Sequence, residues 1–581
     1  MCGISGILTL QPSSGHKEGV EKMVKALHHR GPDDQGLYSN ENGTVHLGHN
    51  RLSIIDLDSR SKQPFLSSDA RFVLTFNGEI YNYLELRSEC QNLGSKFRTS
   101  SDTEVIIESY RHWGEKCLAK FKGMWAFALY DKEKNIVLLS RDFFGIKPLH
   151  FSLIDGETLY FASEIKALRT GLPVPPSIDE VTVDLFLNYG YLDRGNWTFY
   201  KEIKRFPHCK YLLIDLNKDH INLDFQDYWT PFDIDFSASF KTYGEAVSTF
   251  KSLHHESIKL HCRSDVEVGS CLSGGLDSSS IVSQAVKYTN GFKTFTTQYE
   301  EYPDIDESQL AKEISNSFGA KQFFTKPSVA DFKDHLDSMI RSQDEPFGST
   351  SIFSQYMVFN EISKNNVKVV LDGQGADELM GGYLYITRYA LEEYLSKSKY
   401  LTWFKEMISF SKNHGTDYWK TIKNISKPFI HEDPKEYFLQ TIRYKDANSL
   451  EERLSFSPTS FNDLQQYSIF LSFEGNLQQL LRYEDRNSMN FSIESRVPFL
   501  EPALVSFLLQ LPTEYKFRNG FTKSILRSAY ENVIPDKINW QKKKMGFPAP
   551  EKAILKDAYG IEVDIAGSYE WRKFILEKWR R

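Results

Sequence analysis

Short apolar runs bounded by turn-forming residues dominate the first part of the chain. Residues 71–76 read Arg-Phe-Val-Leu-Thr-Phe and end at Asn-Gly, and residues 124–130 read Met-Trp-Ala-Phe-Ala-Leu-Tyr and end at charged residues. A third apolar run covers residues 136–140. Such runs predict β-strands, whereas residues 101–104, Ser-Asp-Thr-Glu, precede an apolar stretch and predict a helix start. We therefore expect an α+β domain built on antiparallel strands.

The pattern changes beyond residue 228. Residues 229–237 have no helical period, which is typical of a connector. Farther on, helical segments alternate with two apolar runs, 266–272 and 367–371, that predict buried strands. Such alternation is typical of an α/β domain with a parallel sheet. We predict a first domain at residues 1–227, a connector at 228–243, and an α/β second domain with a helical C-terminal part at 244–581.

Length and charge narrow the class of protein. The chain has 581 residues, more than one hydrophobic core usually serves. Its net charge of -7 gives no sign of a nucleic-acid or anionic-membrane partner. No run of about 18 apolar residues predicts a membrane span, and the N-terminus lacks a signal-peptide pattern. The 6 cysteines have no C-x-x-C pair or zinc-ligand spacing, so we expect a cytoplasmic protein with reduced thiols.

Cys2 differs from the other cysteines by its position. Once Met1 is removed, the α-amino group of Cys2, with an ordinary pKa of about 8, can take the thiol proton and free a thiolate to attack an amide carbonyl. Several motifs follow in order: Arg30-Gly31-Pro32-Asp33, residues 50–54 (Asn-Arg-Leu-Ser-Ile), residues 77–82 (Asn-Gly-Glu-Ile-Tyr-Asn), residues 101–104, residues 141–149 and Ala162-Ser163-Glu164. Together the set resembles the glutaminase domain of class II glutamine amidotransferases.

This resemblance implies a sandwich of the N-terminal nucleophile hydrolase type (αββα), with Cys2 as the catalytic nucleophile. The oxyanion that forms on the attacked amide needs preorganised donors, and the family pattern assigns this role to the Asn77 side chain and the Gly78 backbone N–H. The residues expected to bind glutamine are Arg51, Asn77, Glu79 and Asp102. A guanidinium suits the α-carboxylate of glutamine, and the two carboxylates suit its α-ammonium group.

A loop rich in glycine and serine follows the apolar run 266–272. It reads Leu272-Ser273-Gly274-Gly275-Leu276-Asp277-Ser278-Ser279. Glycine lets the backbone approach a phosphate closely, and a helix that begins there points N–H groups at the anion. The Walker A pattern is absent. The loop resembles the pyrophosphate-binding loop of ATP pyrophosphatases, which release AMP and pyrophosphate.

A second acidic loop resembles that of asparagine synthetases. Residues 372–378 read Asp-Gly-Gln-Gly-Ala-Asp-Glu, and segments 482–486, 494–500 and 522–527 continue the resemblance. It implies an ATP-pyrophosphatase-type domain that uses ATP and Mg²⁺, with Lys523 as a catalytic cation. The expected Mg²⁺ ligands are Asp277 and Asp377. The residues expected to bind ATP or pyrophosphate are Leu272, Ser273, Gly274, Gly275, Asp277, Ser278, Asp372, Gly373 and Gln374.

Two departures from the family pattern stand out. Gln374 lies where asparagine synthetases often carry glutamate, and it can neither act as a base nor attract an ammonium group as a carboxylate would. Residues 206–209 read Phe-Pro-His-Cys where Pro-Pro-Gly is usual, which is compatible with a simple turn variation. Two further family motifs, at 306–307 and 344–348, suit a structural role as well as a catalytic one.

The leading interpretation is glutamine-dependent asparagine synthesis. Ammonia released at Cys2 would pass through an internal tunnel to a β-aspartyl-AMP made from ATP and L-aspartate, giving asparagine, AMP, pyrophosphate and glutamate. The same machinery acting on another carboxylate, such as a uronic-acid sugar, is the second interpretation. A non-catalytic binding or regulatory homologue is disfavoured because Cys2, Asp277 and Lys523 are all present. A synthetase-only relative would not need the glutaminase residues. The oligomeric state stays open, with a homodimer as one form considered.

Overall fold

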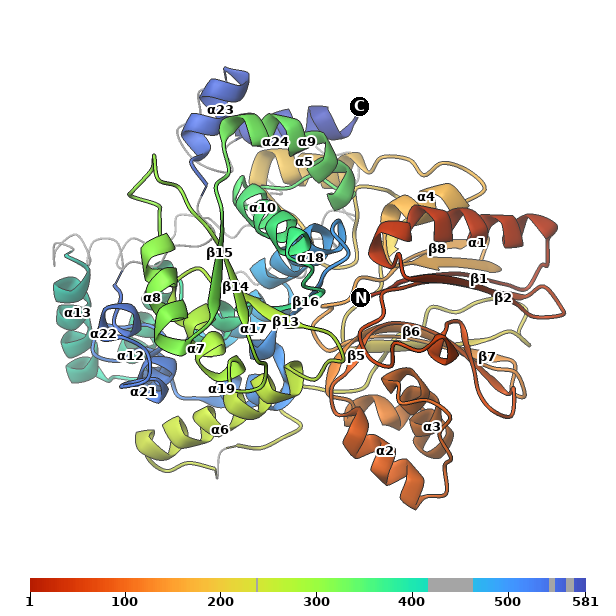
Figure 1. Cartoon of the computed structure of the whole chain (residues 1–581), viewed down its shortest axis with the longest axis horizontal. Helices are drawn as coiled ribbons and strands as arrows, with labels where there is room; N and C mark the ends of the chain where they lie inside the picture. The colour runs from red at the N-terminus through yellow and green to blue at the C-terminus, as the bar shows by residue number, and fades with distance from the viewer. Residues whose placement is uncertain (237–238, 416–462, 543–548, 561–568) are drawn as a thin grey trace.

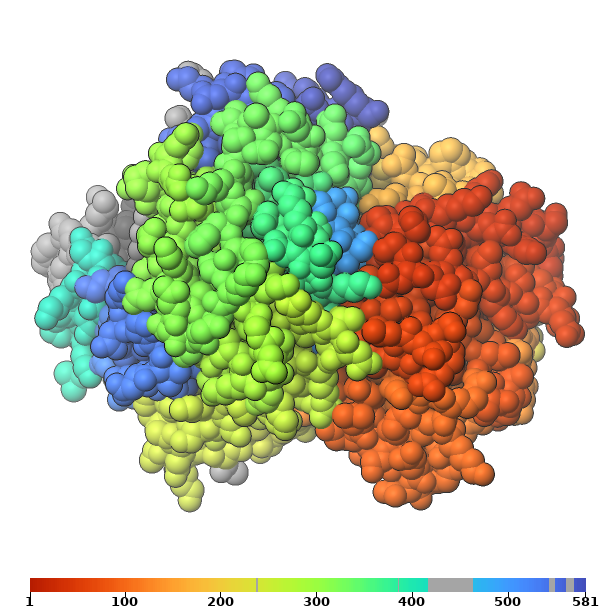
Figure 2. All heavy atoms as spheres, viewed as in Figure 1, coloured from red at the N-terminus to blue at the C-terminus, as the bar shows by residue number. Residues whose placement is uncertain are grey.

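The computed structural model describes residues 1–236, 239–415, 463–542, 549–560 and 569–581. These residues form a layered N-terminal part and a C-terminal part built around a parallel sheet, which lie side by side (Figure 1). In the space-filling view the red start of the chain lies directly against its green middle along a long border (Figure 2). No helix of the described residues is both long and apolar enough to cross a membrane.

Two six-stranded antiparallel sheets form the N-terminal part. The first has the order β10-β8-β9-β1-β3-β2 and the second β12-β11-β7-β6-β5-β4. The strands of the first are β1 (Gly3–Thr9), β2 (Asp34–Ser39), β3 (Val45–Arg51), β8 (His150–Ile154), β9 (Thr158–Ala162) and β10 (Lys204–Arg205). Those of the second are β4 (Phe65–Leu66), β5 (Phe72–Ile80), β6 (Gly123–Asp131), β7 (Ile136–Arg141), β11 (Lys210–Asp215) and β12 (Gln226–Asp227).

Alternating side chains of these strands build the layers. Ile4 and Leu8 of β1 pack in the cluster between the sheets, whereas Ile7 packs with residues of α1 on the outer face. Helices α1 (Ser14–Ala26) and α4 (Ile165–Gly171) cover the first sheet, and α2 (Tyr83–Asn92) and α3 (Asp102–Trp113) lie against the second. The predicted αββα sandwich is therefore confirmed.

One predicted boundary is wrong. The Asn77-Gly78 pair was expected to end a strand, yet β5 continues to Ile80, with Gly78 opposite Trp125 of β6. The hydrogen-bond ladder between β5 and β6 continues through this position because Gly78 has no side chain. Its φ is +156°, and a Cβ there would lie 2.0 Å from the Met124 carbonyl oxygen. The predicted start of α3 is confirmed, since the Ser101 hydroxyl accepts a hydrogen bond from the Thr103 N–H.

A five-stranded parallel sheet organises the C-terminal part. Its order is β15 (Lys321–Thr325), β14 (Lys293–Thr297), β13 (Val268–Cys271), β16 (Val369–Leu371) and β17 (Glu494–Arg496). The two apolar runs predicted as buried strands become β13 and β16, which are neighbours in the sheet. Both faces are covered: α7 (Leu276–Ala285) and α8 (Ser308–Phe318) pack on one, and α10 (Ser351–Lys364) on the other. The predicted α/β class is therefore confirmed.

The remaining described helices of this part lie around the sheet. They are α6 (Tyr243–His261), α9 (Val329–Gln343), α11 (Ala376–Met380), α12 (Thr387–Ser396), α13 (Tyr400–His414), α17 (Leu464–Phe473), α18 (Asn476–Met489), α19 (Pro502–Gln510), α20 (Thr513–Lys516), α21 (Ser524–Ala529), α22 (Asp536–Asn539), α23 (Glu551–Tyr559) and α24 (Tyr569–Trp579). Helix α24 packs against α5 (Glu180–Tyr189), which precedes the predicted connector in sequence. The domain limits at 227 and 243 stay predictions.

Candidate active sites

Cys2 lies at the buried start of β1, where the two parts meet. Its backbone N–H donates to Asn77 Oδ1 over 2.9 Å, and its Sγ lies 3.9 Å from the Leu52 carbonyl oxygen. The amine of Met1 lies 3.2 Å from the carboxylate of Glu494 in β17 of the C-terminal part. Burial raises the pKa of the Cys2 thiol, and the positive chain terminus opposes that shift. With Met1 attached, the Cys2 nitrogen is an amide; removal of Met1 would make it an amine.

The Asn77 side chain contacts Cys2 directly. Because Asn77 Oδ1 is occupied by the Cys2 N–H, its amide nitrogen points elsewhere, and that buried nitrogen has no partner among the described residues. Gly78 follows it along the strand. Asn50, which the sequence names only as the first residue of the motif at 50–54, pairs with Gly3 in the β1–β3 ladder, and both polar atoms of its buried side chain lack a partner among the described residues. Buried unsatisfied amides are uncommon and suit a ligand site.

The residues expected to bind glutamine gather around this point. Arg51, at the end of β3, donates to the carbonyl oxygens of Asp58 at 3.0 Å and Asp56 at 2.5 Å. Asp102 is the first residue of α3 and accepts the Ile80 N–H over 2.9 Å. Burial raises the pKa of Glu79 well above its usual value, with the charges of Glu494 and Asp102 adding to the effect. Burial also raises the pKa of Asp102 to about 6. A cation bound here would relieve the repulsion between these carboxylates.

A cavity of about 630 Å³ opens at the carboxyl ends of β13 and β16. Ligands of α/β proteins commonly bind at this edge of the sheet. The cavity brings the two glycine-rich loops together, and its lining includes Ser273, Gly275, Asp277, Ser278, Asp372, Gly373, Gln374, Asp377 and Lys523. Two predicted residues lie outside its lining. Leu272 is in the core, and Gly274, with a φ of +79°, approaches the start of α8, where a Cβ would lie 2.8 Å from the Ala311 nitrogen.

Lys523 lies between two carboxylates at the cavity wall. Its Nζ is 2.5 Å from Asp277 Oδ2 and 2.6 Å from Asp377 Oδ1. Burial lowers the pKa of Lys523, and the charge of Asp277 opposes the shift. Gly382 makes this approach possible, since a Cβ there would lie 1.8 Å from Asp377 Oδ1 and 2.2 Å from Lys523 Cε. The described residues hold no cluster of three acidic, histidine or cysteine ligands, but two carboxylates at the wall of a cavity suit Mg²⁺, which can take the rest of its ligands from a bound phosphate and water.

Both halves of the chain match known protein families. The model of the glutamine amidotransferase domain matches residues 1–229, and the model of asparagine synthase matches residues 249–562. Asparagine synthetase [glutamine-hydrolyzing] 1 of Bacillus subtilis is 31% identical, covering 96% of this chain and 88% of its own. The chain belongs to the glutamine-hydrolysing asparagine synthetase family.

Two other relatives match over a smaller part of the chain. Putative asparagine synthetase [glutamine-hydrolyzing] 2 of Methanocaldococcus jannaschii is 33% identical over 69% of this chain and 79% of its own. Asparagine synthetase B [glutamine-hydrolyzing] of Escherichia coli is 31% identical over 66% of this chain and 65% of its own. A solved glutamine phosphoribosylpyrophosphate amidotransferase from B. subtilis aligns at a TM-score of 0.32 with 16% identity, over 58% of this chain and 92% of that one. A score that low adds nothing to the fold assignment.

In this synthetase-family chain a buried ionic network joins Cys2 to the C-terminal part. Arg30 donates from Nε to the Cys2 carbonyl oxygen over 2.9 Å and from Nη1 and Nη2 to Asp485 of α18 over 2.8 and 2.9 Å. Its Nη1 also lies 2.6 Å from Glu164 Oε1. Arg30 therefore links the backbone of Cys2 directly to helix α18 of the C-terminal part.

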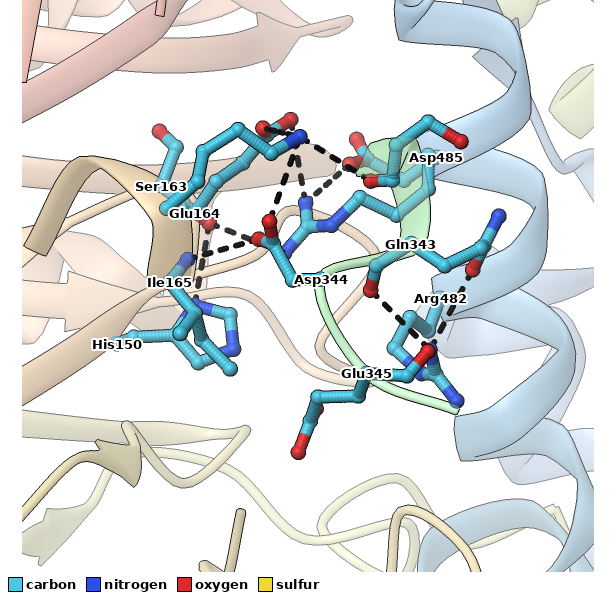
Figure 3. A network of polar contacts seen from close by, with 12 residues as sticks. His150, Ser163, Glu164, Ile165, Gln343, Asp344, Glu345, Arg482 and Asp485 are labelled. Carbon is cyan, nitrogen blue, oxygen red and sulfur yellow. Dashed lines mark hydrogen bonds and ion pairs between the residues drawn. The ribbon is translucent and has the colours of Figure 1, made fainter. Parts of the chain in front are cut away.

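The motif at 344–348 belongs to the same interface. Asp344 accepts the Ile165 N–H over 2.9 Å, and Glu345 accepts the Phe199 N–H over 2.8 Å. Figure 3 shows both on a loop between Glu164 and Ile165 on one side and Arg482 and Asp485 of α18 on the other. These contacts support the structural interpretation of this motif. The motif lies between the N-terminal and C-terminal parts only in the folded chain, so no sequence pattern could have predicted these contacts.

Loss of Asp485 should destabilise the protein strongly. Asp485→Ala leaves the fully buried Arg30 without its bidentate partner, and breaking a buried pair typically costs about 3–5 kcal/mol. The free energy of unfolding, followed by tryptophan fluorescence in urea, measures the effect. The matched control is Glu89→Ala, which removes the exposed Lys120–Glu89 pair and should cost under about 1 kcal/mol. Equal losses in the two variants would contradict a stabilising role for the network.

Proposed function

We propose that this chain is a glutamine-hydrolysing asparagine synthetase that amidates L-aspartate. The observation that carries the proposal is Lys523 held between Asp277 and Asp377 at a cavity built from both glycine-rich loops. This arrangement suits adenylation of a carboxylate by ATP. The glutaminase residues around Cys2 supply a source of ammonia within the same chain.

In the glutaminase half, the thiolate of Cys2 attacks the side-chain amide of glutamine. Removal of Met1 provides the amine that accepts the thiol proton. The Asn77 amide nitrogen and the Gly78 N–H stabilise the oxyanion, and the geometry around Cys2 leaves that Asn77 nitrogen available. Arg51 orients the α-carboxylate, while Glu79 and Asp102 hold the α-ammonium. Ammonia leaves, and water hydrolyses the glutamyl thioester to glutamate.

In the synthetase half, the acceptor carboxylate attacks the α-phosphate of ATP and displaces pyrophosphate. The residues proposed to bind the phosphates are those of the two loops that line the cavity, and the N-terminus of α7 points its N–H groups towards them. Lys523 neutralises charge on the departing pyrophosphate. Asp277 and Asp377 would hold Mg²⁺, which when bound offsets the charge of the triphosphate. Ammonia then attacks the acyl-adenylate and releases AMP.

The first test is pyrophosphate release by the purified protein with ATP, Mg²⁺ and glutamine, with and without L-aspartate. Release that depends on aspartate, together with asparagine detected by mass, is the expected result. Glutaminase activity without any response to aspartate would reject aspartate as the acceptor.

The second candidate is the same reaction on a different carboxylate, such as a uronic-acid sugar. Gln374 at the cavity wall, in place of glutamate, is the observation that favours it. A panel of sugar acids in the pyrophosphate assay separates the two candidates. Pyrophosphate release with a sugar acid and none with aspartate would establish the second.

The rate of glutamine hydrolysis should fall at low pH as Asp102 becomes protonated. Its pKa is raised to about 6, so its side chain is charged above that pH and neutral below it. Only the charged form attracts the α-ammonium of glutamine, and kcat/KM for glutamine should therefore fall about tenfold per pH unit below the pKa. The charges of Glu79 and Glu494, which interact with the Asp102 carboxylate, influence the pH at which this decline is half complete. A variant Asp102→Asn should have a lower kcat/KM for glutamine that no longer falls in this way at low pH. If the fall at low pH persists in the variant, it cannot be assigned to Asp102.

A further inference from the structure

Arg527 is a buried cation in the wall of the cavity that contains Lys523. It lies on α21, one helical turn after Lys523, and only 8% of its surface is exposed. Lys523 is held between two carboxylates. Among the described residues no carboxylate forms an ion pair with the Arg527 guanidinium, and the charge that acts on it is that of Asp277. A buried positive charge without such a partner is costly, so this position suits a bound anion.

Backbone carbonyls hold the Arg527 guanidinium in one orientation. Its Nε donates to the Thr522 carbonyl oxygen over 2.8 Å, and its Nη1 donates to the Asn539 carbonyl oxygen. The Asn539 amide in turn donates to the Arg527 carbonyl oxygen over 3.0 Å. The Phe521 ring lies against the group, with Cζ 5.1 Å from the ring centroid. The guanidinium is therefore preorganised, and its Nη2, which makes no hydrogen bond to a described residue, is left for a ligand in the cavity.

The charges around Arg527 place it on the side of the cavity that carries the first glycine-rich loop. Burial lowers the pKa of Arg527 to about 10, and the charge of Asp277 opposes that shift. At neutral pH the group is below its pKa and stays charged. Asp277 is in the first turn of α7, directly after that loop. Burial lowers the pKa of His414, and the charges of Arg527 and Lys542 add to the effect. Two cations thus share one end of the cavity, beside the loop proposed to bind phosphates.

We infer that Arg527 binds the β- and γ-phosphates of ATP and holds them as pyrophosphate leaves. The inference rests on the proposed function. When the acceptor carboxylate attacks the α-phosphorus, the bond from that phosphorus to the oxygen shared with the β-phosphate breaks, and its electron pair stays on that oxygen. The charge that develops there needs no proton when preorganised cations lie beside it. Lys523 supplies one such cation, and Arg527 supplies a second, whose planar N–H groups match phosphate oxygens.

Binding of inorganic pyrophosphate tests this contact without the chemical step. Titration calorimetry of the full-length protein with inorganic pyrophosphate and Mg²⁺ gives the dissociation constant. Arg527→Met should weaken this binding by about tenfold to a hundredfold, the usual range for one charge-assisted contact, whereas binding of AMP should stay within about threefold. Arg527→Lys should lie between the two, because it keeps the charge and loses the planar fork. Thermal unfolding of each variant verifies that it is folded.

Arg87 provides a matched control. It lies on α2 and donates to the carbonyl oxygens of Thr99 over 2.8 Å and Ser101 over 3.1 Å, and its Cζ is 4.2 Å from the Phe97 ring centroid. It therefore makes the same kinds of contact as Arg527 but does not line the cavity. Arg87→Met should leave the affinity for pyrophosphate within about twofold of the unmodified enzyme, as expected for a residue outside the site.

A double variant separates a direct contact from an effect through Lys523. Arg527 binds the Thr522 carbonyl directly before Lys523, so its loss could displace the lysine. If Arg527 contacts pyrophosphate itself, Lys523→Met/Arg527→Met should bind pyrophosphate at least about fivefold more weakly than either single variant, because separate contacts add. If Arg527 acts only through Lys523, the double variant should bind as Lys523→Met does.

Three results would overturn the inference alone. They are an unchanged affinity for pyrophosphate in Arg527→Met, an equal loss of affinity for AMP, and a double variant that binds pyrophosphate as Lys523→Met does. Failure of the unmodified protein to bind either pyrophosphate or ATP is a different result, because it would reject the proposed adenylation together with the inference. Rejection of aspartate as the acceptor would leave this test intact, since the same phosphates leave whichever carboxylate is amidated.

Discussion

Cys2→Ala is expected to reduce the rate of glutamine-dependent asparagine synthesis by about 10³-fold or more, which is the usual effect of removing a catalytic nucleophile. Synthesis from ammonium salts should stay within about twofold of the unmodified enzyme, because the cavity that contains Lys523 is a separate site and ammonia can reach it from solution. The Cys2 side chain is small and buried, so alanine keeps the packing while it removes the thiol. The two activities, measured as asparagine formed per unit time, separate the sites.

A control cysteine makes this result specific. Cys90 on α2 is also buried, its Sγ lies 3.9 Å from the Ser109 hydroxyl, and it belongs to none of the motifs of the site. Cys90→Ala should retain both activities. Loss of both activities in a folded Cys2→Ala variant would contradict a model with two sites, and retention of glutamine use would contradict Cys2 as the nucleophile.

Lys523→Met is expected to reduce aspartate-dependent pyrophosphate release by about 10²–10³-fold, the usual cost of one preorganised charge at a reacting centre. Methionine keeps much of the length of the side chain but leaves Asp277 and Asp377 without the cation between them. Basal hydrolysis of glutamine should persist, because Cys2 and its neighbours are untouched. Pyrophosphate release and glutamate formation measured on the same preparation give the two readouts.

A second buried lysine serves as the matched control. Lys516 at the end of α20 is 1% exposed and does not line the cavity. Lys516→Met should leave pyrophosphate release within about threefold of the unmodified enzyme, as expected for a residue that makes no contact in the transition state. A similar loss in both variants would mean that burial of a lysine, and not its position between the aspartates, decides the activity.

The fold could be predicted where one local pattern decides the structure. The apolar runs at 266–272 and 367–371 became neighbouring strands because a parallel sheet buries both faces of each strand. The predicted strand end at Asn77-Gly78 was wrong because pairing with a distant strand overrides the local pattern there. Asn-Gly is a strong local turn signal, but the ladder with β6 overrides it and needs glycine for its close approach to Met124. Local preference could not reveal that partner.

The candidate sites could be predicted as lists of residues but not as connections between the halves. Motifs located the two glycine-rich loops, and the structure brings them to one cavity. The contacts of Arg30 with Asp485, of Met1 with Glu494 and of Gln374 with Glu484 join segments far apart in sequence. No spacing or periodicity in one sequence encodes such pairs, because their side chains meet only after both halves have packed together.

Transfer of nitrogen from glutamine labelled with ¹⁵N in its side-chain amide tests the central claim most directly. The reaction contains ATP, Mg²⁺, L-aspartate and an excess of unlabelled ammonium, and the product is analysed by mass. The proposed function predicts that most of the new asparagine carries ¹⁵N in its amide, because ammonia released at Cys2 reaches the acyl-adenylate inside the protein. Asparagine without the label, or labelled ammonium in solution with no asparagine formed, would contradict it.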